Sequence, residues 1–133
     1  QTPGEGEAFV EAVAAMPVED RLPMLVEAGM TGAGARACAE ANGATMGACI
    51  LSLYRSAVQP HMSMWGAEFA TLAHRPRTLV VIAHDDHFTG GPDIARGVAQ
   101  QWGASVAELD GLGHWWMMQD PARSAAMLNE FLG

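Results

Sequence analysis

Carboxylate and imidazole side chains gather in two short loops in the second half of this 133-residue sequence. The first loop contains Asp85 and Asp86 one residue after an apolar run, and the second contains His114 in the pattern Gly-Leu-Gly-His-Trp-Trp. An imidazole titrates near neutral pH, and a carboxylate on one ring nitrogen orients it to accept a proton at the other. These residue types predict general-base chemistry at His114, with Asp85 or Asp86 as its partner.

The first loop also reads His84-Asp-Asp-His87, which resembles a cluster of metal ligands. Four consecutive residues rarely converge on one ion, and no further histidine or cysteine lies nearby in the sequence. We therefore expect no metal site and no cofactor. The two cysteines, Cys38 and Cys49, are too few for a disulfide framework, and we expect both to be small core residues.

The elements around these loops predict an α/β fold with a parallel sheet. Residues 77–83 form an apolar, β-branched run, which is typical of a strand buried on both faces, and residues 104–109 alternate as a shorter strand. Helical patterns over 92–103 and 120–131 follow the two loops. Because parallel strands end at the same sheet edge, we expect the two loops to meet there.

The first 75 residues carry helical patterns only. Proline, glycine and Asn-Gly signals separate the apolar stretches from one another. The composition changes near Arg75-Pro76, which predicts a helical region over 1–75 and a β-α-β-α portion over 76–133. The expected helices of the first region span residues 5–15, 18–28, 31–41, 45–58 and 61–73.

The second half resembles the C-terminal part of α/β-hydrolases. In that family a late strand leads to the catalytic acid, and the next leads to a Gly-x-Gly-His loop followed by aromatic residues and an acidic-Pro helix start. Residues 78–86 and 109–121 have this order, and residues 53–60 are similar to the segment that leaves a helical cap. The resemblance implies the C-terminal portion of such a hydrolase preceded by a cap, with Asp86 as the catalytic acid and His114 as the base.

The nucleophile of that family is missing here. No Gly-x-Ser-x-Gly pattern occurs, and the stretch around Cys49 lacks the second glycine and does not follow a predicted strand. Two strands alone also leave open sheet edges. We therefore expect a partner, either an N-terminal hydrolase half in another segment or chain, or a second copy in a homo-oligomer.

Apolar side chains near His114 and in the cap-like region are candidates for a substrate pocket. Methionine and tryptophan suit small apolar substrates, although the same residues would equally suit a core. The candidates are Trp115, Trp116, Met117, Met62 and Trp65.

Composition narrows the function classes further. The formal net charge of −8, without a lysine or arginine cluster, argues against nucleic acid as a partner. No apolar run approaches the roughly 18 residues of a membrane span. The first residues lack the basic start and apolar core of a signal peptide, so we expect a cytoplasmic protein.

The resemblance implies cleavage of an ester, lactone or similar bond, with Asp86 and His114 supplied by this chain. Epoxide hydrolases and haloalkane dehalogenases share this half of the fold and use an aspartate nucleophile, so that chemistry stays open. The alternative is a non-catalytic module that binds an apolar ligand or a partner through the cap and the Trp/Met surface.

Overall fold

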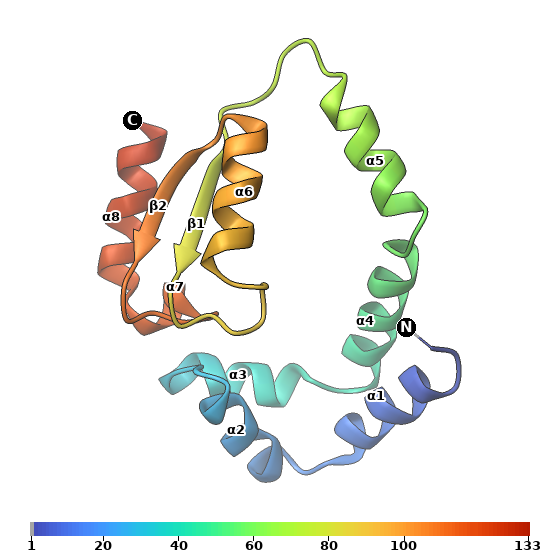
Figure 1. The fold of residues 1–133 in the computed structure, drawn as a ribbon. Helices are drawn as coiled ribbons and strands as arrows, with labels where there is room; N and C mark the ends of the chain where they lie inside the picture. The colour runs from blue at the N-terminus through green and yellow to red at the C-terminus, as the bar shows by residue number, and fades with distance from the viewer. Residues whose placement is uncertain (1) are drawn as a thin grey trace. The chain divides into compact units, whose positions relative to one another are not determined.

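The computed structural model describes residues 2–133, which divide into two compact units (Figure 1). The first unit extends to Leu25 and resumes over Ala35–His74. The second unit combines Val26–Gly34 with Arg75–Gly133. The segment Val26–Gly34, which the sequence placed in the cap-like region, thus belongs with the strands.

Helices alone make up the first unit. Helices α1 and α4 pack against each other, with glycines at the contact. A Cβ on Gly47 would lie 2.9 Å from the Cβ of Val10, so only glycine allows this approach. An ion pair at 2.7 Å between Glu7 and Arg55 joins the same two helices. The five helices are α1 (Glu5–Ala15), α2 (Val18–Glu27), α3 (Gly32–Ala41), α4 (Ala44–Ser56) and α5 (His61–Ala70). Helices α2 and α3 extend by their last and first residues, respectively, into the segment Val26–Gly34 of the second unit.

Each of these helices lies where the sequence predicted one, with ends that differ by up to three residues. The expectation that both cysteines are core residues is wrong for Cys49, which is exposed on α4, while Cys38 is partly buried. The small side chains that do fill the interior of this unit are Ala35 and Ala39 on α3. Among residues 2–133, no helix is long and apolar enough to cross a membrane.

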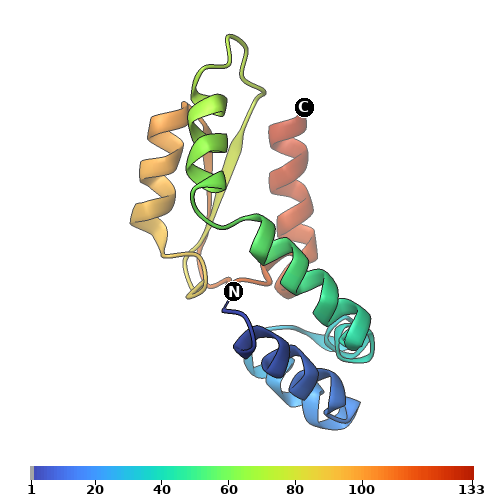
Figure 2. The ribbon, with the colours of Figure 1, turned by 90° about the vertical axis from the view of Figure 1, so that its right-hand side faces the viewer.

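The second unit has mixed α/β character, as predicted. Strands β1 (Leu79–Ala83) and β2 (Ser105–Leu109) pair in parallel, with Leu79 opposite Ser105 and Ala83 opposite Leu109. Helix α6 (Pro92–Trp102) connects the strands, and the chain continues through α7 (Trp116–Gln119) into α8 (Pro121–Leu132). Helices α6 and α8 lie on opposite sides of the sheet (Figure 2).

Local signals explain the limits of these helices. Pro92 and Pro121 begin α6 and α8, where a missing N–H costs no helical hydrogen bond. Asp120 caps α8 by accepting the backbone N–H of Arg123 at 3.0 Å. Gly103 ends α6 with a φ of 64°, a left-handed conformation that favours glycine. The short α7 was not predicted.

The core of the second unit lies near the carboxyl ends of the strands. Ile82, Ala83 and Leu109 are buried, and so is Ala99 of α6. Residues 79–81 of β1 are only partly buried, so the expectation of a strand covered on both faces is wrong for its first part. The sheet is therefore most deeply buried where the two loops begin.

Candidate active site

Backbone hydrogen bonds bring the two candidate loops together at the carboxyl edge of the sheet. The N–H of His84 donates to the carbonyl of Leu109, and the N–H of Asp85 donates to the carbonyl of Leu112. The N–H of Asp86 then turns back to the carbonyl of Ala83 at 3.1 Å. This turn ends β1 and sets the direction of the Asp86 side chain.

The structure places Asp86 and His114 in direct contact. Oδ2 of Asp86 lies 3.0 Å from Nδ1 of His114, although the residues are 28 positions apart in the sequence. The Asp86 side chain is 10 % exposed and the His114 side chain 37 % exposed. Asp85 is exposed and its side chain makes no such contact with His114. Of the two acids that the residues alone left open, Asp86 is the one that pairs with the imidazole.

Hydrogen bonds keep Asp86 ionised despite its burial. Burial raises the pKa of this carboxyl, but the N–H of Phe88, the His114 imidazole and the Thr89 hydroxyl together hold the pKa below its usual value. The Phe88 N–H reaches Oδ1 at 2.8 Å, and the Thr89 hydroxyl reaches Oδ2 at 3.1 Å. A carboxylate can only accept hydrogen bonds, so the proton between Oδ2 and His114 resides on Nδ1.

A side-chain amide braces the loop that carries His114. Gln119 of α7 accepts the N–H of Gly113 at 2.7 Å and donates to the carbonyl of Gly29 at 2.9 Å. Gly113 packs so closely that an added Cβ would lie 3.2 Å from the carbonyl oxygen of Asp85. Thr31 donates to the carbonyl of Met118, which ties the same helix to the segment Val26–Gly34.

Sequence reasoning missed Gln119 and Gly29. The signal was faint, because a glutamine after four apolar residues and a glycine after a helix are both common. Only the fold brings these residues, 90 positions apart, into contact.

Aromatic rings and two hollows surround the imidazole. The His114 ring lies 5.1 Å from the Phe88 ring and 5.1 Å from the Trp115 ring, measured between centroids. A hollow of about 540 Å³ is lined by His114, Phe88 and Gln119 together with Gly29. A second hollow of about 400 Å³ lies along β1 and α6 and contains His114 and Asp86 with the predicted pocket residues Trp115, Trp116 and Met117.

The other two pocket candidates lie in the first unit. Met62 and Trp65 are on α5 and are 47 % and 52 % exposed. Neither is a core residue. Their part in a substrate pocket stays a prediction.

His84, the first residue of the His84–His87 cluster, contacts Glu108 and not His114. Nε2 of His84 lies 2.8 Å from Oε2 of Glu108, and Oε1 of the same carboxylate accepts from the Arg96 guanidinium at 3.0 Å. These hydrogen bonds, from His84 first and then Arg96, hold the pKa of Glu108 below its usual value. In the part of the chain that is described, no three histidine, cysteine or acidic side chains converge as metal ligands would.

Two hydroxyl groups of the second unit form hydrogen bonds with partners other than His114. Within the second unit, the buried Ser124 hydroxyl donates to the carbonyl of Trp116, and Thr89 donates to Asp86. The imidazole is thus oriented at Nδ1, and its Nε2 has no hydrogen-bond partner among the described residues.

Comparison with protein-family models, with curated proteins and with solved structures finds no match to this chain.

Proposed function

We propose that this chain supplies the acid–base pair of an α/β-hydrolase that cleaves an ester, lactone or similar bond. Asp86 is the positioning acid and His114 the general base. The observation that carries the proposal is the 3.0 Å contact between Oδ2 of Asp86 and Nδ1 of His114 at the carboxyl edge of parallel strands. Catalytic groups in α/β folds gather at this edge.

The geometry supports a defined proton path. With Nδ1–H directed at Asp86, the lone pair of Nε2 can accept the proton of an attacking hydroxyl. The imidazolium that forms is stabilised by Asp86, whose lowered pKa keeps it anionic. The same Nε2–H then returns the proton to the leaving group. General acid–base catalysis of this kind contributes roughly 10²- to 10⁴-fold in rate.

In this proposal the nucleophile and the oxyanion donors come from an N-terminal hydrolase half, in another segment or another chain. Trp115, Trp116 and Met117 support a small apolar substrate, since they line the hollow that contains Asp86 and His114. We also propose that the protein is cytoplasmic.

A fluorophosphonate probe tests the assignment, because it labels a serine only when a neighbouring base activates it. An affinity tag on this chain would isolate the complete catalytic unit. We expect probe labelling that His114→Ala abolishes and that His84→Ala, which alters the neighbouring Glu108 contact, leaves intact. Labelling that persists in His114→Ala would refute the proposal. If the probe does not label the unit, but the unit turns over an epoxide or a haloalkane and needs His114 to do so, the nucleophile is an aspartate.

One observation favours a second candidate function, a non-catalytic binding module. Met62, Met64 and Trp65 all stand about half exposed on α5. In that case a hydrophobic ligand would bind saturably, Trp65→Ala would weaken binding, and His114→Ala would leave it unchanged. Binding that needs His114 but not Trp65 would contradict this alternative.

A further inference from the structure

The outer edge of β2 has open backbone groups. On the inner side, the N–H of Ser105 donates to Thr78 and the carbonyl of Leu109 accepts from His84. Backbone groups alternate between the two sides of a strand, so Val106 and Glu108 direct their N–H and C=O groups away from β1. In the described residues the sheet contains β1 and β2 only. Val106 is correspondingly 44 % exposed.

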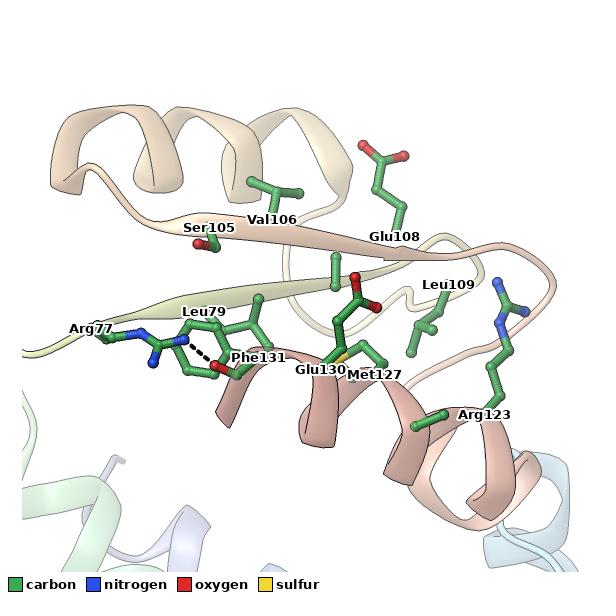
Figure 3. A pocket seen from close by; sticks show the side chains of 12 residues that line it. Arg77, Leu79, Ser105, Val106, Glu108, Leu109, Arg123, Met127, Glu130 and Phe131 are labelled. Carbon is green, nitrogen blue, oxygen red and sulfur yellow. Dashed lines mark hydrogen bonds between the residues drawn. The ribbon is translucent and has the colours of Figure 1, made fainter. Parts of the chain in front are cut away.

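A hollow of about 600 Å³ lies beside this edge, between β2 and α8 (Figure 3). Leu109 points toward α8, whereas Val106 and Glu108 point to the other face of the sheet. On that face Glu108 is held by Arg96 of α6.

Helix α8 runs antiparallel to β2 and is fixed at both ends. Near its start, Arg123 donates to the carbonyl of Asp110 at 2.9 Å, just after β2. Near its end, the guanidinium of Arg77 donates to the carbonyl of Phe131 and also lies over the ring of Phe131. Since Arg77 precedes β1, this end lies at the level where β2 begins. The middle of α8, at Ala126, therefore lies level with Ala107, the middle of β2.

Charges of opposite sign lie at similar distances on either side of this middle. Arg123 and Glu130 line the hollow two helical turns apart, one on either side of Ala126. Both side chains are exposed. A rotation of 180° through Ala107 exchanges the two positions, which places each arginine opposite a glutamate.

We propose that β2 pairs antiparallel with β2 of a second copy of this chain, about a two-fold axis at Ala107. Val106 then lies opposite Glu108 of the second copy, and each such pair exchanges both backbone hydrogen bonds. Arg123 faces Glu130 of the second copy, twice by symmetry. The small side chains of Ala107 and Ala126 let the copies approach at the axis. This dimer does not depend on a catalytic role of His114.

Charge reversal tests the interface through the dimer dissociation constant, measured by analytical ultracentrifugation. Arg123→Glu and Glu130→Arg each turn two attractive pairs into repulsive ones, and we expect each to weaken the dimer by about tenfold or more. The double variant R123E/E130R restores opposite charges and should restore the dimer, although Arg123 no longer reaches Asp110. A monomeric wild-type chain, or a double variant as weak as the singles, would overturn the proposal.

A disulfide test fixes the register independently. In a chain carrying Cys38→Ala and Cys49→Ala, Ala107→Cys should cross-link to itself, because the two Cα atoms would lie about 4.5 Å apart. Ser105→Cys is the matched control, since its Cα would lie about 14 Å from that of its own copy. Equal cross-linking of the two variants would exclude this axis.

Discussion

Replacing Asp86 with asparagine should invert the tautomer of His114. Oδ1 of Asp86 accepts the N–H of Phe88 at 2.8 Å, and a backbone N–H can only donate. The asparagine oxygen must therefore stay at that position. Its NH₂ group then occupies the place of Oδ2, which lies 3.0 Å from Nδ1 of His114 and 3.1 Å from the Thr89 hydroxyl. Nδ1 becomes an acceptor, and the proton moves to Nε2.

The size of the effect follows from the strength of the contact. A hydrogen bond to a charged group contributes about 1.5–3 kcal/mol, and the lower end applies because His114 is 37 % exposed. That corresponds to roughly a tenfold preference for the Nδ1–H form in the wild type. In a serine-type triad the equivalent substitution lowers turnover about 10⁴-fold, because the base then presents a proton instead of a lone pair.

Imidazole ¹⁵N spectra at alkaline pH report the tautomer directly. We expect the Nδ1–H form in the wild type, the Nε2–H form in Asp86→Asn, and no change in the control Asp85→Asn, whose side chain does not reach the ring. If Asp86→Asn and the wild type share one tautomer, the orientation by Asp86 is refuted.

Three further predictions concern stability. Leu109→Ala should lower the free energy of unfolding by about 2–5 kcal/mol in urea titrations, because this side chain is 2 % exposed; the exposed Leu132→Ala is the control, and equal losses would contradict the assigned core. Gln119→Ala should lower the free energy of unfolding by about 1–3 kcal/mol and speed hydrogen exchange at Gly113, because the Gly113 N–H and the Gly29 carbonyl both lose their hydrogen-bond partner. Unchanged exchange at Gly113 would contradict this role of Gln119. Hydrogen bonds from Arg55 lower the pKa of Glu7 from 4.5 to about 2, so this pair stabilises the fold above about pH 4.5 and loses its effect as the pH falls toward about 2. Glu7→Gln should thus melt below the wild type near neutral pH but not near pH 2, and a difference that persists at pH 2 would contradict this linkage.

The candidate pair could be anticipated because it depends on simple rules. Two strands separated by a helix predict a parallel pair, and parallel strands bring their following loops to one edge. His114 is therefore expected near Asp85 and Asp86. The residues alone do not distinguish the two acids, because which one reaches His114 depends on the turn that joins the Asp86 N–H to the carbonyl of Ala83.

Other features depend on contacts that have no local pattern. Gln119 links Gly113 to Gly29, which is 90 residues from Gln119, so no sequence spacing predicts this contact. The apolar run of β1 predicted burial on both faces, yet burial depends on which elements cover a strand, and residues 79–81 remain partly exposed. Cys49 was expected in the core from its residue type, but its position on α4 faces solvent.

The most direct test of the central claim is the rate of ester hydrolysis by the complete catalytic unit, isolated through a tag on this chain. Short p-nitrophenyl esters serve as substrates, and His114→Ala is compared with His84→Ala. We expect His114→Ala to lower kcat by at least about 10³-fold and His84→Ala to leave kcat within a few-fold of the wild type. Equal rates for the wild type and His114→Ala would contradict the assignment of His114 as the catalytic base.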